Sequence, residues 1–190
     1  MSILAIRRFT LATATAAALL VAAPSFAANY QQAAGSSLTF ASKYEGEVFT
    51  GRFPGFVTTF SFDPAQLATA KLDVSIPLAS ATTANTDRDD ALKGSDFFAS
   101  GKFPQARYTA TKFRSLGGNQ YAADGALSLR GVSKPVTLTF TWTPGAQPVL
   151  NGKATVKRLD FGVGTGDWAD TALIPNEVAI STKVVFAPAK

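Results

Sequence analysis

Residues 136–142 read VTLTFTW, a run in which large apolar side chains alternate with threonines. A period of two places all the apolar residues on one face of an extended strand. The same period recurs in residues 38–44, 71–76, 127–130 and 178–186. These stretches are rich in β-branched and aromatic residues, which is typical of half-buried strands. The sequence therefore predicts a chain built mainly of amphipathic strands.

Turn-forming residues lie between the predicted strands, at Gly117-Gly118-Asn119, Pro144-Gly145 and Asn151-Gly152. Strands at short spacing, with few helical stretches between them, are typical of an antiparallel sheet closed as a barrel or stacked as a sandwich. A chain of 190 residues has the usual length of one domain. We therefore expect a single all-β domain.

Residues 84–94 interrupt the alternation with a helix-compatible segment. Asn85 or Thr86 can cap its start, and Gly94 can end it. Acidic side chains near the start suit the positive end of a helix dipole, and this segment has three: Asp87, Asp89 and Asp90. We expect a short helix that covers one end of the β structure, followed by an aromatic-rich loop.

The first 27 residues have the pattern of a secretory signal peptide. Arg7 and Arg8 precede an apolar run over residues 11–23, and Ser25-Phe26-Ala27 offers small residues at a cleavage site after Ala27. A helix of such a run covers about 20 Å, which is short for a membrane span of about 30 Å. The two arginines leave both the Sec and the Tat route open. Residues 28–190 then form the exported domain, and without Arg7 and Arg8 the formal charge falls from +5 to +3.

The composition excludes several classes of chemistry. The chain has no cysteine and no histidine, which removes thiol nucleophiles, Ser-His triads, disulfides and the usual zinc, copper and haem ligands. The basic residues are not clustered, so we do not expect nucleic-acid binding. We expect no cofactor, no metal site and no enzyme activity.

Three weaker motifs remain. The acidic cluster of residues 87–90 is more typical of a solvated helix start than of an acid-base pair. A calcium loop starting at Asn85 would need glycine at its sixth position and glutamate at its twelfth, where this chain has Asp90 and Asp96. The GVGTG stretch of residues 162–166 precedes no clear helix, so we interpret its glycines as loop residues and not as a phosphate cradle.

Aromatic residues are abundant, and 13 of the 15 phenylalanines, both tryptophans and all four tyrosines follow residue 27. An eight-stranded barrel has room either to be filled by its own side chains or to hold one ligand. The composition leaves both alternatives open.

Several sequence blocks occur along the chain in an order and spacing that are typical of one protein family. Three of them are specific in combination: RDDALKGSDFF at residues 88–98, LSLRGVSKP at 127–135 and RLDFGVG at 158–164. Shorter blocks fall between and around them in the family's order, and these are KYEGEVFTGRF at 43–53, FSFD at 60–63, Phe103-Pro104, Asp167-Trp168 and Glu177-Val178. Taken together, the blocks resemble the YceI-like family of polyisoprenoid-binding proteins, and the resemblance spans residues 33–186.

The resemblance implies an extended, lipocalin-like antiparallel β-barrel of about eight strands with a hydrophobic pore. It further implies export to the periplasm and binding of an isoprenoid lipid, often a quinone or polyprenyl chain. Strand phase and the family blocks together indicate ten pocket candidates: Phe40, Leu72, Val74, Ile76, Phe97, Phe98, Phe103, Leu138, Phe140 and Trp142.

Four charged residues within the blocks are candidates for contacts with a polar head group at the barrel mouth: Arg88, Asp89, Arg158 and Asp160. The alternative is a structural role, in which they fasten the helix or close the barrel end as buried ion pairs. Trp168, in a glycine-rich loop, is a candidate rim residue.

Two other functions stay open. The resemblance suggests an accessory role beside an inner-membrane cytochrome, without catalysis. A carboxylate-based enzyme would instead require two acidic side chains that face one cavity. The ligand's chain length and head group, the choice between carrying, storing and sensing it, and a homodimer are likewise left open.

Overall fold

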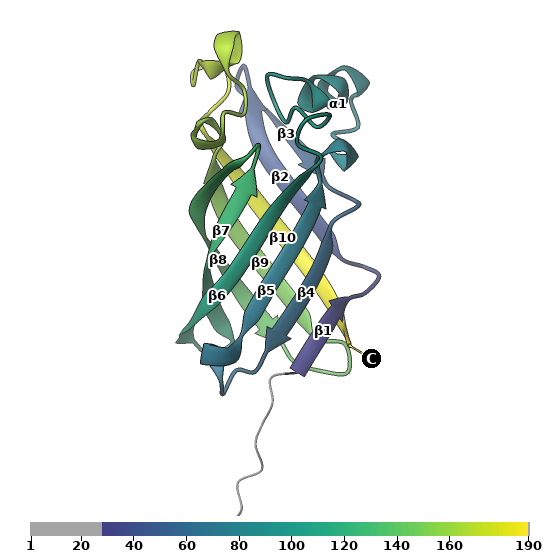
Figure 1. The fold of residues 1–190 in the computed structure, drawn as a ribbon, viewed down its shortest axis with the longest axis vertical. Helices are drawn as coiled ribbons and strands as arrows, with labels where there is room; N and C mark the ends of the chain where they lie inside the picture. The colour runs from purple at the N-terminus through teal and green to yellow at the C-terminus, as the bar shows by residue number, and fades with distance from the viewer. Residues whose placement is uncertain (1–27, 190) are drawn as a thin grey trace, which may run out of the picture.

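Antiparallel strands form one continuous sheet over residues 28–189, which are the residues that this computed structural model describes (Figure 1). The predicted signal peptide lies outside them. Within this range the strands are β1 (Ala28–Gln32), β2 (Ser37–Tyr44), β3 (Glu47–Arg52), β4 (Val57–Phe62), β5 (Lys71–Pro77), β6 (Gln105–Gly117), β7 (Gln120–Leu129), β8 (Val132–Thr143), β9 (Val149–Lys157) and β10 (Glu177–Pro188).

The sheet closes on itself through β1. Strand β10 pairs with β9 along one edge, and along its other edge it pairs first with β2 and then with β1. β1 also pairs with β4, with Tyr30 opposite Phe60, and this pairing completes the ring. β1 and β2 therefore share one position around the barrel, and β3 pairs antiparallel with the outer edge of β2, from Thr39 opposite Arg52 to Tyr44 opposite Glu47. The predicted closed barrel of about eight strand positions is confirmed.

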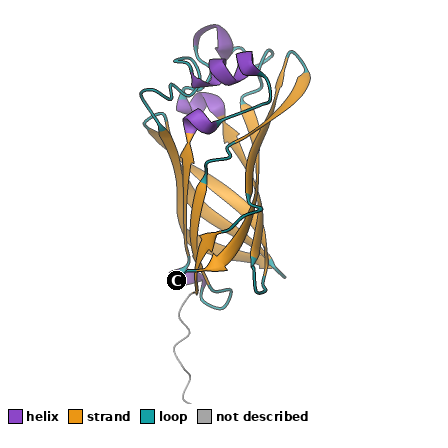
Figure 2. Cartoon of the chain, turned by 90° about the vertical axis from the view of Figure 1, so that its right-hand side faces the viewer, coloured by secondary structure: helices purple, strands orange, loops and turns teal. Residues whose placement is uncertain are grey.

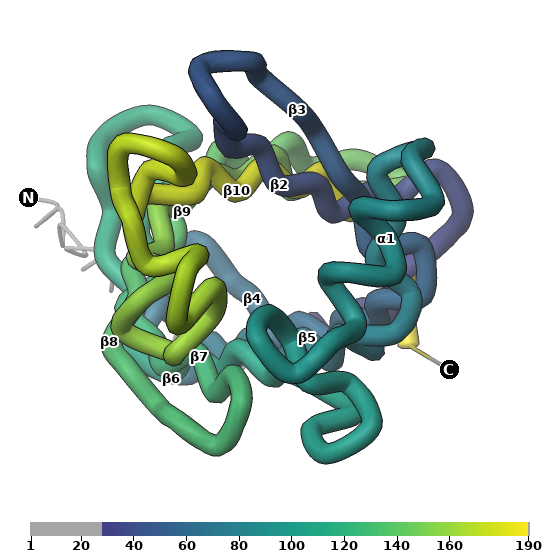
Figure 3. The backbone as a smooth tube through the Cα atoms, turned by 90° about the horizontal axis from the view of Figure 1, so that it is seen from above, coloured from purple at the N-terminus to yellow at the C-terminus, as the bar shows by residue number. Residues whose placement is uncertain are grey.

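The helices gather mostly at one end of the barrel, as Figure 2 shows. They are α1 (Thr86–Lys93) and the 3₁₀ turns η1 (Leu67–Thr69), η2 (Leu78–Ser80), η3 (Arg158–Phe161) and η4 (Gly166–Ala169). We call the end that carries α1, η3 and η4 the mouth. Seen from above, α1 lies on one side of the mouth and the segment of η3 and η4 on another (Figure 3). In the part of the chain that the structure describes, no helix has the length and apolar character needed to cross a membrane.

The predicted helix is confirmed, because α1 begins and ends within residues 84–94. Asn85 is its N-cap, and the side chain accepts a hydrogen bond of 2.9 Å from the backbone N–H of Arg88. Gly94 follows the last helical residue. The acidic residues of the first turn lie at the positive end of the helix dipole, where they are favourable.

One predicted turn is wrong, since Asn151-Gly152 lies inside β9. Gly152 is buried and faces the barrel interior, where a β-carbon would lie only 2.9 Å from Leu138 Cδ1. This glycine therefore permits close side-chain packing within the barrel and does not mark a change of chain direction. The other two predicted turns lie between strands, after β6 and after β8.

Aromatic rings fill the end of the barrel opposite the mouth, and we call this cluster the plug. It comprises Tyr30, Phe60, Phe62, Phe113, Tyr121, Phe140, Trp142 and Phe186. Phe60 is at its centre, 1% exposed, with ring centroids 4.8 Å from Phe62 and 5.7 Å from Trp142. Most of these ring pairs are tilted or edge-to-face, which are favoured arrangements for aromatic side chains.

Replacement of Phe60 by alanine should lower the free energy of unfolding by about 3–5 kcal/mol, because it removes a buried ring and leaves a cavity in the plug. The half-buried Phe97 at the mouth provides the control, and Phe97→Ala should cost clearly less. Urea denaturation of the wild type and both variants measures the difference. Equal losses in the two variants would show that the plug is not a main source of stability.

Candidate functional site

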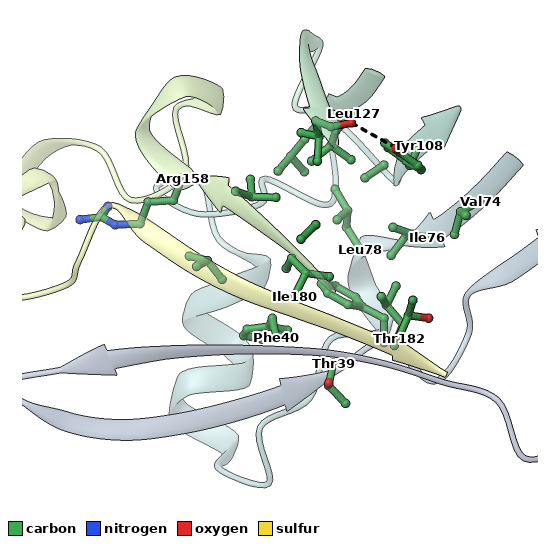
Figure 4. Close-up of a pocket in the computed structure, with 18 of the residues that line it drawn as sticks. Thr39, Phe40, Val74, Ile76, Leu78, Tyr108, Leu127, Arg158, Ile180 and Thr182 are labelled. Carbon is green, nitrogen blue, oxygen red and sulfur yellow. Dashed lines mark hydrogen bonds between the residues drawn. The ribbon is translucent and has the colours of Figure 1, made fainter. Parts of the chain in front are cut away.

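A cavity of about 200 Å³ occupies the barrel between the plug and the mouth. Side chains from most of the strands, from α1 and from the mouth loops line it, and Figure 4 shows part of this lining. Within residues 28–189 the lining contains no Asp or Glu, and its polar members are Thr39, Ser42, Thr58, Tyr108, Arg158 and Thr182. The site is therefore a mainly aliphatic chamber of the kind that takes apolar ligands.

Strand alternation builds the chamber wall. On β5, the residues Leu72, Val74 and Ile76 all line the cavity, as their shared phase predicts. Val74 pairs with Tyr108 on β6, and Ile76 pairs with Ala106. A small residue such as Ala106 leaves space inside the barrel that a larger side chain would fill. The cavity thus arises where inward side chains are small or aliphatic.

Seven of the ten pocket candidates line the cavity: Phe40, Leu72, Val74, Ile76, Phe97, Phe98 and Leu138. Phe140 and Trp142 do not, and this part of the prediction is corrected. They share the inward face of β8 with Leu138 but lie farther along the strand, where they belong to the plug. Phe103 is also outside the lining, with its ring beside Gly131 in the turn between β7 and β8.

Several lining residues that were not predicted as pocket residues lie on strands with the same alternating pattern. Val178 and Ile180 on β10 line the cavity, and the period-two pattern had placed them on one strand face. Ala154 and Val156 on β9 also line it, but the incorrect turn prediction at Asn151-Gly152 hid that strand.

Tyr108 spans the wall with a polar tip that is satisfied inside the protein. Its hydroxyl donates to the carbonyl oxygen of Ala123 at 2.8 Å, with that of Val136 also within reach at 3.1 Å. The ring lies against Gly125, where no side chain obstructs it. Burial raises the pKa of Tyr108 to about 12, so the hydroxyl is neutral over the physiological range.

Arg158 is 4% exposed and acts as a clamp at the mouth. Its guanidinium donates to the carbonyl oxygens of Val163, Gly164 and Ile174 at 2.7–3.0 Å, and to that of Pro175 at 3.1 Å. Burial lowers the pKa of this arginine. In Figure 4 the guanidinium points away from the apolar side chains of the cavity. The arrangement supports the structural alternative, with carbonyl groups in place of the predicted ion-pair partner.

Arg130, which is not among the predicted site residues, joins two segments of the mouth. Its guanidinium donates to Ser95 O at 3.0 Å and to Asp96 O at 3.1 Å, and also to the carbonyl oxygens of Phe97 and Gly162. Its backbone has a φ of 52° in the tight turn between β7 and β8. One side chain therefore connects the loop after α1 to the glycine-rich loop after η3.

The other charged candidates have separate places. Asp89 accepts hydrogen bonds from the Thr82 hydroxyl at 2.7 Å and from the N–H and hydroxyl of Thr83 at 2.6 and 2.7 Å, which fastens α1 to the preceding loop. Arg88 lies over the Phe49 ring, 4.5 Å from its centroid. Asp160 is exposed. Residues 28–189 contain no group of three acidic side chains arranged to hold a metal ion.

The glycines of residues 162–166 are loop residues at the mouth, and their interpretation as loop glycines is confirmed. Gly162, Gly164 and Gly166 all have positive φ angles, of 66°, 71° and 62°. Gly164 also packs directly against the Arg158 guanidinium, so a side chain there would collide with the clamp. The Trp168 ring lies 5.5 Å from that of Phe97 and 6.3 Å from that of Tyr44, which places it at the rim.

Comparison with known proteins identifies relatives over almost the whole described chain. The family model for the YceI-like domain matches residues 30–186. A Pseudomonas savastanoi pv. phaseolicola protein named UPF0312 protein is 31% identical over 172 residues, covering 84% of this chain and 90% of its own. A UPF0312 protein of Vibrio vulnificus is 30% identical over 177 residues, covering 84% and 93%.

Solved structures share the fold. Burkholderia cenocepacia BcnA is 32% identical and superposes with a TM-score of 0.77, covering 80% of this chain and 96% of its own. The Campylobacter jejuni YCEI protein is 28% identical, with a TM-score of 0.64 over 74% of this chain and 84% of its own. A polyisoprenoid binding domain from Saccharophagus degradans reaches a TM-score of 0.64 at 16% identity, over 86% and 99% of the two chains. At that identity the likeness is one of fold.

Asp89→Asn should lower the free energy of unfolding by roughly 1 kcal/mol at pH 7, because it weakens three charge-assisted hydrogen bonds. Partial burial raises the pKa of Asp89, but the hydrogen bonds from Thr83 and Thr82 outweigh it and hold this pKa below 3.8. A carboxylate with a depressed pKa stabilises the fold above its unfolded pKa and loses this effect as the pH falls through its folded pKa.

The difference in the free energy of unfolding between wild type and Asp89→Asn should therefore be present at pH 5–7 and vanish toward about pH 2. Urea denaturation across this range measures it, with the exposed Asp160→Asn as control. A difference that persists unchanged at low pH would contradict the role assigned to the carboxylate.

Proposed function

Because the chain belongs to the YceI-like domain family, we propose that it is a binding protein that holds an isoprenoid lipid in its barrel cavity, without catalysis. The observation that carries the proposal is the cavity itself, an aliphatic chamber closed at one end by the plug. The polyisoprenoid-binding domain of Saccharophagus degradans has the same fold, which supports this class of ligand.

The chemistry of the lining suits such a chain. Each methylene group moved from water into an apolar site contributes about 0.8 kcal/mol, so a few isoprene units supply substantial binding energy without any ionic contact. The charged member of the lining, Arg158, turns its guanidinium to backbone carbonyls. The wall therefore presents aliphatic and aromatic surface to a ligand, as an uncharged lipid chain requires.

The absence of acidic residues from the described lining also bears on catalysis. A carboxylate-based enzyme would need two acidic groups that face the same cavity. Asp89 belongs to the acidic cluster of residues 87–90. Hydrogen bonds from Thr82 and Thr83 hold its carboxylate, and Asp89 does not line the cavity. The cavity thus offers surface for binding but no acid-base pair.

We further propose that the protein acts in the periplasm and carries or stores its lipid there. The signal peptide predicted in residues 1–27 would export the chain to the periplasm, where a membrane lipid cannot cross the aqueous space unaided. A barrel that covers the isoprenoid chain of a quinone or polyprenyl lipid would carry or store it there.

Mass spectrometry of an organic extract tests the ligand directly. Protein purified from its periplasm should yield about one isoprenoid molecule per chain, and the mass should identify the head group. A clean extract from folded protein that also takes up no added isoprenoid quinone would overturn the proposal.

A cavity-filling variant tests the place of binding. Ala154 lines the chamber on β9, so Ala154→Phe should fill part of it and weaken isoprenoid binding at least tenfold, since ligand and ring compete for one volume. Ala179 on β10 is exposed, and the same substitution there should leave binding unchanged. Titration with a fluorescent apolar probe, displaced by an isoprenoid, measures both. Equal affinities in the two variants would place the ligand outside the cavity.

A further inference from the structure

Three strands of the barrel change abruptly from cavity lining to phenylalanine. The lining ends on β4, β8 and β10 at a residue of small or moderate size, namely Thr58, Leu138 and Val184. On each of these strands the next inward residue is a phenylalanine outside the lining, and these are Phe60, Phe140 and Phe186. All three are buried members of the plug. We call their rings the stop, since they form the layer of the plug that faces the cavity.

The rings of the stop meet across the interior of the barrel. The ring centroid of Phe60 lies 5.9 Å from that of Phe140, edge to face, and 5.7 Å from that of Phe186. β4 and β8 lie on opposite sides of the barrel, because β5, β6 and β7 separate them on one side and β9, β10 and the shared position of β1 and β2 on the other. The contact between Phe60 and Phe140 therefore spans the interior and closes it to a chain that enters from the mouth.

The distance from the mouth to the stop limits the length of chain that can enter. On β10 the lining runs from Val178 to Val184, about 20 Å along the strand at about 3.3 Å per residue, and on β9 it runs equally far, from Leu150 to Val156. With strands tilted by about 35–45°, this corresponds to about 15 Å along the barrel axis. An isoprene unit adds four main-chain carbon atoms, which span about 5 Å when extended with bonds of about 1.5 Å. One extended pass from mouth to stop therefore holds at most about three units.

We propose that Phe60, Phe140 and Phe186 form a stop that sets how much of an isoprenoid chain the barrel can cover. This proposal rests on the proposed lipid-binding function and specifies its ligand by length. Units inside the chamber exchange water for apolar wall and add to the affinity, whereas units beyond the mouth stay in water and add little. The rings are packed against one another in a close-packed interior, so they do not yield to a longer chain without loss of contacts.

A length series tests the limit, with isoprenoid alcohols of one to five isoprene units as the probes. Displacement of N-phenylnaphthylamine from the full protein measures each affinity. In the wild type, the step from one unit to two should tighten binding at least about tenfold, because the added carbons are buried. The step from three units to four should change the affinity by less than about twofold, because the fourth unit stays outside. An affinity that rises about tenfold with every unit through the fifth would overturn the stop.

Phe60→Ala tests the central ring of the stop. The substitution opens space for about one more isoprene unit at the end of the chamber, so the length at which the affinity levels off should increase by about one unit. Phe62→Ala is the matched control on the same strand, because Phe62 is equally buried, at 1% exposed, but lies one inward position deeper. Its void stays behind Phe60, and the levelling length should not change. An unchanged levelling length in Phe60→Ala, or an equal increase in both variants, would overturn the assignment of the stop.

The outcomes separate this inference from the function beneath it. Should Phe60→Ala not fold, the wild-type series decides, since the levelling of its affinity needs no variant. Binding that strengthens through the whole series would overturn the stop and leave lipid binding standing. Failure of the wild type to bind any member of the series would overturn both.

Discussion

In a closed barrel, every second side chain of each strand must point into one shared interior, whatever its size. β4 shows the consequence within five residues. Thr58 is small and lines the cavity, whereas Phe60 and Phe62 are large and fill the plug. β10 repeats the gradient, with Ile180 and Val184 on the cavity and Phe186 in the plug. The ordered change of side-chain size along the strands creates a chamber that is closed at one end.

The mouth depends on a second constraint, because a buried charge needs partners. The buried Arg158 and the partly buried Arg130 both donate to backbone carbonyls and not to carboxylates. Loops at a barrel end leave carbonyl groups outside the strand ladder, and the two guanidinium groups collect these into fixed positions. The loop glycines complete the arrangement, as Gly164 shows by its contact with Arg158. The rim is thereby ordered while the chamber below it stays free of exposed charge.

These two constraints connect to the proposed function. An aliphatic wall binds a chain through burial, which is strong but does not discriminate between chains of similar length. Discrimination needs polar groups at defined points, and Thr58 is a lining residue whose buried hydroxyl has no partner within residues 28–189.

The sequence by itself determined the strand faces, the short helix and the family, because period-two alternation, capping residues and sequence blocks are local properties of the chain. It also placed Leu72, Val74 and Ile76 correctly on one inward face. Only the tertiary structure decided depth along the barrel axis, because strand tilt and register come from pairing between distant segments. For this reason Phe140 and Trp142 were predicted in the pocket but lie in the plug, and Arg130 was missed although it joins two mouth loops. The unpaired Thr58 hydroxyl likewise becomes visible only once the closed wall shows which polar groups have partners.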